Sequence, residues 1–190
     1  MPLVLLLGGA RSGKSALAVR MAGGWAGPVA VVATLEARDQ EMAERIRRHR
    51  GERPGHWLTL EAPRELERAL REAPADAFVI VDCLTLWVSN LLEQPDLPDR
   101  EIQRRAQDAA ALAASRAAPT VAVSNEVGSG IVPAATLARR YRDLLGAVNT
   151  AWAAAADQAL LLVAGRALPL LDPMRALGGG PGGLAGAHGG

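Results

Sequence analysis

The stretch Gly8-Gly-Ala-Arg-Ser-Gly-Lys-Ser15 decides the fold of this chain. It fits the phosphate-binding loop known as the P-loop, in which a glycine is followed by four residues of any type and then by Gly-Lys-Ser. The apolar run Leu3–Leu7 comes directly before it and is typical of a buried parallel strand. Ala16–Met21 follows it and contains good helix formers. This order of strand, loop and helix is the context that the motif requires, and a chance glycine turn is the alternative.

The residue types of the loop suit the binding of a nucleoside triphosphate and Mg²⁺. Gly8 and Gly13 allow a positive φ and a close approach of the backbone, so that successive amide groups can surround phosphate oxygens at a helix N-terminus. Lys14 is the only lysine of the chain, and we expect it to reach the β and γ phosphates and to act in catalysis. The Ser15 hydroxyl would ligate Mg²⁺, which bridges those phosphates.

Apolar runs alternate with helical patterns along the rest of the chain. This predicts an α/β fold of the P-loop NTPase (RecA-like) type, with a mostly parallel sheet and helices on both faces. Strands are expected at Leu3–Leu7, Pro28–Thr34, Ala77–Asp82, Val121–Ser124 and Gln158–Ala164, with a short extended piece at Trp57–Glu61. Helices are expected at Asp39–Arg50, Pro63–Arg71, Leu84–Leu92, Glu101–Arg116 and Ala134–Ala156.

The length of 190 residues suits one domain, which we expect to span residues 1–172. Residues 173–190 are rich in glycine and alanine and are predicted to form a disordered tail. The formal net charge of +1 gives no case for nucleic acid or an anionic membrane as a partner. No apolar run approaches the roughly 20 residues that span a bilayer, and no charged leader precedes Leu3. With Cys83 as the single cysteine, the chain is expected to be cytoplasmic.

Polar residues follow several of the predicted strands. Because ligands of parallel sheets collect at the carboxyl ends of the strands, we expect these residues to share a crevice with the P-loop: Thr34, Asp82, Asn125 and Glu126. Asp82 closes an apolar strand, where the carboxylate that orients Mg²⁺ is expected. The alternative role of Asp82 is to cap the helix that follows.

His49 is the histidine that the surrounding sequence singles out. It lies seven residues after Met42, close to the same face of an ideal helix, so packing on a buried stripe is one interpretation. Its flanking arginines favour a neutral imidazole with a lowered pKa, and a neutral imidazole can attack phosphorus. These arginines form either a solvated face or a clamp for phosphate oxygens. They are Arg45, Arg47, Arg48, Arg50 and Arg53.

Taken together, these motifs resemble the bifunctional adenosylcobinamide kinase and adenosylcobinamide-phosphate guanylyltransferase family of cobalamin biosynthesis. The resemblance runs from Leu3 to about Pro169. Two segments are particular to this family, His49 with Arg53-Pro54 and Trp57, and Asn125-Glu-Val-Gly128. The other matching segments are Gly8–Ser15, Ala33-Thr34, Asp39–Ile46, Thr59–Glu61, Asp82–Leu92, Val123–Pro133 and Arg140–Asn149.

The resemblance implies two reactions. A nucleoside triphosphate, ATP or GTP, phosphorylates adenosylcobinamide, and the enzyme then takes GMP from GTP onto a histidine and passes it to the new phosphate. The histidine that matches is His49, whereas His56 matches a variable position. The resemblance also implies a homo-oligomer, typically a trimer. By the same resemblance, the guanine-nucleotide contacts of the family correspond to Gly8, Gly9, Ala10, Arg11, Ser12, Gly13, Lys14, Ser15, Ala33, Thr34, Leu35, Arg50, Gly51, Glu52, Arg53, Glu61 and Asp82.

Two departures from the family pattern are the tail and Arg166-Ala-Leu-Pro169, which follows the closing segment of the family only loosely. Two other functions stay open: a P-loop kinase for another small molecule without a covalent step, and a nucleotide-binding switch without catalysis. A RecA-like motor that moves on nucleic acid is disfavoured, because Phe78 and Tyr141 are the only Phe and Tyr and the chain has no basic stripe interleaved with aromatic residues.

Overall fold

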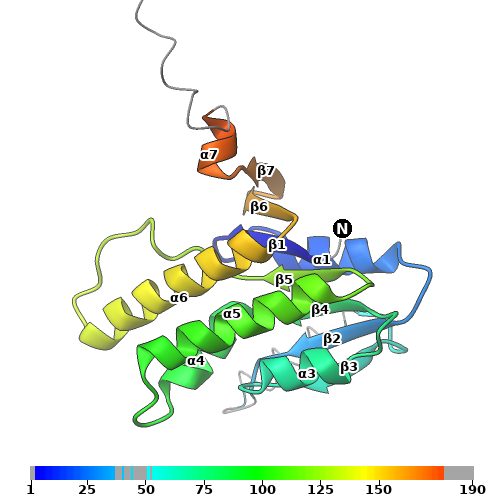
Figure 1. Ribbon diagram of the computed structural model, residues 1–190, viewed down its shortest axis with the longest axis horizontal. Coiled ribbons are helices and arrows are strands. Elements are labelled where there is room, and N and C mark those ends of the chain that lie inside the picture. The colour runs from blue at the N-terminus through cyan, green and yellow to red at the C-terminus, as the bar shows by residue number, and fades with distance from the viewer. Residues whose placement is uncertain (1–2, 37–39, 41–43, 45–50, 52, 178–190) are drawn as a thin grey trace, which may run out of the picture.

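A computed structural model describes residues 3–36, 40, 44, 51 and 53–177. This part of the chain forms a seven-stranded sheet in the order β3-β2-β4-β5-β1-β6-β7 (Figure 1). Neighbouring strands are parallel except β6 and β7, which pair antiparallel. The strands are β1 (Leu3–Gly8), β2 (Val29–Ala33), β3 (Leu58–Glu61), β4 (Phe78–Asp82), β5 (Thr120–Val123), β6 (Gln158–Val163) and β7 (Arg166–Leu170).

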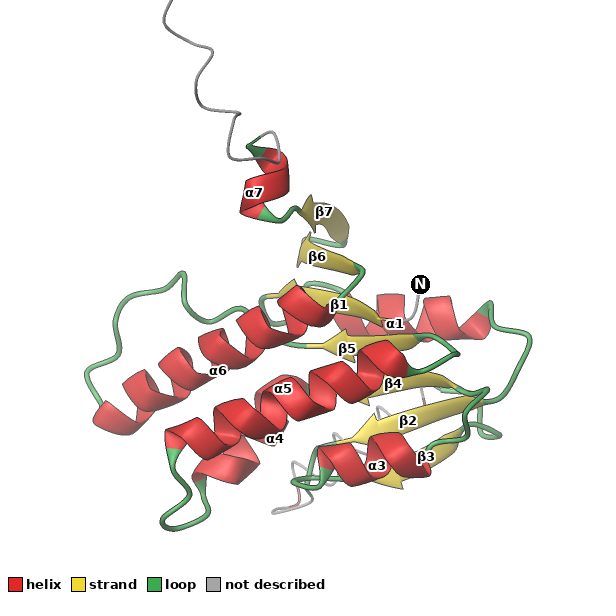
Figure 2. Cartoon of the chain, in the orientation of Figure 1, coloured by secondary structure: helices red, strands yellow, loops and turns green. Residues whose placement is uncertain are grey.

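Helices cover both faces of the sheet, as predicted (Figure 2). One face carries α1, and the other carries α3, α4, α5 and α6. The described helices are α1 (Lys14–Gly23), α3 (Leu66–Glu72), α4 (Leu84–Leu92), α5 (Asp99–Ser115), α6 (Thr136–Ala155) and α7 (Pro173–Ala176). None of these described helices is both long enough and apolar enough to cross a bilayer.

The sequence of β1 explains this two-sided covering. Its side chains alternate between two buried clusters, with Leu3, Leu5 and Leu7 on the side of α3 to α6 and with Val4 and Leu6 on the side of α1. A strand buried on both faces has no polar side to present, which is why Leu3–Leu7 is uninterruptedly apolar. β1 lies between β5 and β6, so the P-loop starts from the middle of the sheet.

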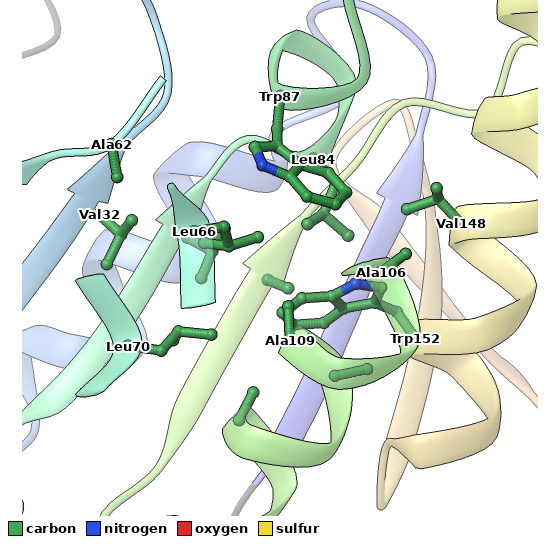
Figure 3. Packing of buried hydrophobic residues seen from close by; sticks show 14 of the residues in the cluster. Val32, Ala62, Leu66, Leu70, Leu84, Trp87, Ala106, Ala109, Val148 and Trp152 are labelled. Atoms are coloured by element: carbon green, nitrogen blue, oxygen red, sulfur yellow. The ribbon is translucent and has the colours of Figure 1, made fainter. Parts of the chain in front are cut away.

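Two tryptophans fill the larger cluster. Trp87 of α4 and Trp152 of α6 are both fully buried, and Figure 3 shows Leu84 between them and Ala109 beside Trp152. The Trp87 indole also needs a hydrogen-bond acceptor once it is buried. It donates from Nε1 to the Arg64 carbonyl at 3.0 Å, which ties α4 to the loop after β3.

Most of the predicted elements are confirmed, and the differences lie at their ends. α1 begins at Lys14 rather than Ala16, and α5 begins two residues before the expected Glu101. The antiparallel strand β7 was not predicted. The helix expected at Asp39–Arg50 lies outside the described residues, apart from Gln40 and Glu44, which are helical.

Of the predicted tail, Pro173–Ala176 forms the short helix α7, which differs from the expectation of disorder for these residues. Residues 178–190 lie outside the described part of the chain, so disorder there stays a prediction.

Candidate functional site

The P-loop connects the end of β1 to the start of α1. Gly8 has φ +150°, and a Cβ at this position would lie 2.3 Å from the Leu162 carbonyl oxygen of β6. Gly13 has φ +98° and is the N-cap of α1. Both values confirm the prediction that these positions need glycine. The turn between β6 and β7 supports the loop from the side, because the Gly165 amide donates to the Ser12 carbonyl at 3.1 Å.

Lys14 is folded back onto the loop that precedes it. Its ammonium group donates to the Gly8 carbonyl at 2.8 Å, to the Gly9 carbonyl at 2.7 Å and to Ser12 Oγ at 3.2 Å. Only 6% of the residue is exposed, and burial lowers the pKa of the ammonium group. The three oxygens satisfy its donors without a ligand, so a bound phosphate would exchange with partners that the loop itself provides.

The P-loop opens on a cavity of about 810 Å³ at the carboxyl ends of the strands. This is where the rule for parallel sheets places a ligand. Most of the predicted site residues line it, although they come from the P-loop, α1, β2 and the loop after it, β3, β4 and the segment before β3. These are Ala10, Arg11, Ser12, Gly13, Lys14, Ser15, Ala33, Leu35, Arg53, Glu61 and Asp82.

Asp82 forms an ion pair with Arg53 inside this cavity. Arg53 Nη2 lies 2.7 Å from Asp82 Oδ2, and the two side chains are 11% and 12% exposed. The N-cap of α4 is Cys83, which makes no capping hydrogen bond through its side chain. The alternative that Asp82 caps α4 is therefore wrong, and its carboxylate faces the cavity with the P-loop lysine and serine.

Unlike these residues, Thr34 does not line the cavity. It is fully buried, and its hydroxyl accepts from the Cys83 amide and donates to the Cys83 carbonyl, both at 2.8 Å. The side chain therefore joins the ends of β2 and β4. Asn125 lines the cavity as expected. Glu126 is held near the P-loop by its backbone, since its amide donates to the Gly8 carbonyl at 3.2 Å.

A family model described as cobinamide kinase / cobinamide phosphate guanyltransferase matches residues 4–170. The chain belongs to this family. Two curated members are the bifunctional adenosylcobalamin biosynthesis proteins CobP of Pseudomonas aeruginosa and CobU of Salmonella typhimurium. The first is 44% identical over 87% of this chain and 95% of that protein, and the second is 42% identical over 86% and 96%.

The family resemblance stated from the sequence is thereby confirmed, and with it the P-loop α/β fold. A solved structure from Pyrococcus horikoshii has a TM-score of 0.52 at 9% identity, covering 88% of this chain and 84% of that chain. At this identity the likeness concerns the fold alone.

Some residues that the cobinamide kinase family resemblance singled out cannot be placed in the cavity. His49, Arg50 and Glu52 lie outside the described residues. Gly51 is described and exposed, and it does not line the cavity. Their assigned roles stay predictions.

Several residues of the site in this cobinamide kinase family member were not singled out from the sequence. Glu36 and Pro63 line the cavity from the loops after β2 and β3, and Thr59 lines it from β3 itself. Thr85 lines it from α4 and accepts the Asn125 amide on its hydroxyl at 2.7 Å. The sequence signal for Thr85 was a polar residue in a mostly apolar helix. Asn90 is a second buried polar residue of α4 with the same signal.

The cavity also fits a Mg²⁺ ion that accompanies a nucleotide. Ser15 and Asp82 both line it, so one hydroxyl and one carboxylate are available. Among the described residues, no three His, Cys, Asp or Glu side chains gather into a metal cluster. Few protein ligands are what Mg²⁺ uses when substrate phosphates and water complete its coordination.

Proposed function

We propose that this chain is a bifunctional enzyme of cobalamin biosynthesis. It phosphorylates adenosylcobinamide with ATP or GTP and then transfers GMP from GTP to the product, which gives adenosylcobinamide-GDP and pyrophosphate. One observation carries the proposal: in a member of the cobinamide kinase family, the P-loop, Lys14 and Asp82 open on a single cavity large enough for a nucleotide. The family description names both activities, so membership of the family supports this proposal more than a kinase without a covalent step or a nucleotide-binding switch.

The phosphorylation step draws on the P-loop. The hydroxyl oxygen of adenosylcobinamide attacks the γ phosphorus and loses its proton, the bond from that phosphorus to the β–γ bridging oxygen breaks, and the nucleoside diphosphate leaves. Loop amides and Lys14 stabilise the charge on the transferring group, and Mg²⁺ held by Ser15 and Asp82 would neutralise phosphate charge. The remaining nucleotide contacts are those assigned above, from Gly8 to Asp82.

The guanylyl transfer requires a nucleophile, for which we propose His49. A neutral imidazole nitrogen attacks the α phosphorus of GTP, a P–N bond forms, and pyrophosphate leaves. A phosphate oxygen of adenosylcobinamide phosphate then attacks the same phosphorus, and the P–N bond breaks. The arginines that flank His49 in the sequence would favour the neutral imidazole that the first step needs.

The test is to incubate the protein with GTP labelled on the α phosphate and to separate it on a denaturing gel. We expect a labelled protein band that is lost in acid and retained in base, as for a P–N bond. His49→Asn should abolish the band and the guanylyl transfer while keeping phosphorylation within about tenfold, because that step needs no enzyme nucleophile. His56→Asn is the matched control and should keep both activities.

An acid-stable label, or a label that persists in His49→Asn, would exclude the histidine intermediate. Phosphorylation without any label in the wild-type protein would instead favour a kinase that lacks the covalent step. Tight nucleotide binding without turnover on cobinamide would favour the switch.

We further propose a cytoplasmic homo-oligomer, which the resemblance suggests to be a trimer. Its nucleotide substrates belong to the cytoplasm. Self-association is supported by the edge strand β7 and its surroundings, where Val163, Leu168 and Leu171 are at least 61% exposed. Sedimentation analysis would measure the mass in solution, and a single monomeric species at micromolar concentration would contradict the oligomer.

A further inference from the structure

Asn90 is a buried polar residue in an apolar helix. α4 has the sequence Leu-Thr-Leu-Trp-Val-Ser-Asn-Leu-Leu, and Asn90 is only 4% exposed. Its side-chain nitrogen donates to two backbone carbonyls, that of Thr34 at 2.7 Å and that of Pro63 at 2.9 Å. One amide group therefore uses both of its N–H donors on two separate segments.

The two carbonyls belong to loops that border the nucleotide cavity. Thr34 directly follows β2, and Pro63 lies two residues after the end of β3. In the same loops, Leu35 and Glu36 line the cavity after β2, and Pro63 itself lines it after β3. Asn90 contacts these loops from behind and does not line the cavity.

A second contact reinforces the same connection. Arg64 Nη1 lies 2.8 Å from Glu36 Oε1, which links the loop after β3 to the loop after β2. Arg64 Nε also donates to the Asn90 carbonyl at 3.2 Å. The carbonyl of Arg64 accepts the Trp87 indole, which is packed in the core (Figure 3). Through these bonds the two loops are fixed to α4 and to each other.

The position of these loops relative to the P-loop decides which part of a nucleotide they can reach. β2 is three strands from β1 in the sheet, which at strand spacing is about 14 Å. A nucleotide whose phosphates lie on the P-loop amides would extend its nucleoside toward the far wall, where Leu35, Pro63 and Glu61 lie. Apolar surface and a carboxylate suit a base that carries N–H donors.

We propose that Asn90 is a positioning residue for the nucleoside part of the substrate. By binding the Thr34 and Pro63 carbonyls, it fixes the position of the loops after β2 and β3, which form one wall of the cavity. A side chain without two N–H donors leaves these carbonyls unsatisfied and lets the loops move apart. The inference rests on the proposed function in so far as the cavity holds a nucleoside triphosphate.

The test compares GTP with inorganic tripolyphosphate, which has the phosphates but lacks the nucleoside. Both dissociation constants are measured by calorimetry in the presence of Mg²⁺. For Asn90→Ala we expect the affinity for GTP to fall at least tenfold while that for tripolyphosphate stays within about twofold. Ser89→Ala, the preceding position of the same helix, is the matched control and should change neither affinity more than twofold.

Two further variants keep the test decisive if Asn90→Ala fails to fold by circular dichroism. Asn90→Ser keeps one hydroxyl donor, and Arg64→Gln removes the charge pair with Glu36 at a partly exposed site. Each variant should lower the affinity for GTP by about threefold and leave the affinity for tripolyphosphate unchanged.

Equal losses for both ligands, or no loss for GTP in a folded variant, would overturn the role of Asn90. Failure of the proposed function gives a different result. The wild-type protein would then bind GTP without turnover on cobinamide, or, if the cavity is no nucleotide site at all, it would bind neither ligand.

Discussion

Arg53 and Asp82 form a nearly buried ion pair in the cavity, with Nη2 and Oδ2 2.7 Å apart. The carboxylate that we propose for Mg²⁺ therefore already has a cationic partner, and a metal ion has to compete with the guanidinium for it. The pair also joins the end of β4 to a residue that comes before β3, so its loss affects both stability and activity.

Asp82→Asn tests both effects. It removes the charge for Mg²⁺ and leaves the Arg53 guanidinium without this partner, which for a nearly buried pair costs about 2 kcal/mol of unfolding free energy. We expect weaker Mg²⁺-dependent turnover together with a lower midpoint of urea unfolding. The double variant Asp82→Asn/Arg53→Gln should recover stability but not Mg²⁺-dependent turnover. Recovery of both would mean that the carboxylate serves only to neutralise Arg53.

Lys14→Ala removes a cation that the P-loop holds on three oxygens. Because that cation would stabilise the transferring phosphoryl group, both activities should fall at least about 10²-fold. The matched control is Arg20→Ala, which removes an exposed cation from the same helix and should leave both rates unchanged. Near-normal phosphorylation by Lys14→Ala would contradict the assigned role of the P-loop.

Gly8 and Gly9 are adjacent glycines that should respond differently to alanine. At Gly8 a Cβ meets the Leu162 carbonyl at 2.3 Å and φ is +150°, so Gly8→Ala should lower the unfolding free energy by at least about 2 kcal/mol. At Gly9 no atom lies within 4 Å of the Cβ position, and Gly9→Ala should change stability by less than about 0.5 kcal/mol. Urea unfolding measures both, and equal effects would contradict the described loop geometry.

The raised pKa of Tyr141 makes the stability of the protein depend on pH in the alkaline range. Burial, with a smaller contribution from Cys83, raises the pKa of this phenol from 10.0 to about 12, and its hydroxyl donates to the Thr85 carbonyl at 3.3 Å. Between these two pH values the unfolded chain releases the proton while the folded chain keeps it. The unfolding free energy should therefore fall from pH 10 to pH 12, by about 2 kcal/mol for this group.

Tyr141→Phe isolates that contribution, because Tyr141 is the only tyrosine of the chain. Its unfolding free energy, measured in urea at pH 9 and at pH 12, should fall less than that of the wild-type protein. A parallel decrease in the two proteins would show that the phenol is not buried as described.

Local sequence patterns were sufficient for much of the fold and the phosphate site. The run Leu3–Leu7 and the glycines at positions 8 and 13 act within a few residues of each other, so their spacing alone predicts a strand, a loop and a helix. Asp82 was also predicted as a member of the cavity, since a single carboxylate at the end of an apolar strand has a definite place in a parallel sheet.

Contacts between distant segments were beyond such patterns. The partner of Asp82 is 29 positions away, and the two carbonyls that Asn90 binds are 56 and 27 positions away. Strand β7 was missed for another reason. It has only five residues and contains Pro169, and proline within a short apolar run argues against a strand.

The central place of β1 has a consequence for synthesis on the ribosome. Leu3 pairs with Thr120 and Val4 with Gln158, so the first strand made waits for partners translated more than a hundred residues later. The hydrogen bond from the Gly165 amide to the Ser12 carbonyl likewise forms only after residue 165 has been translated. A nascent chain thus completes its P-loop near the end of translation, and chains released early lack the strands that support the loop.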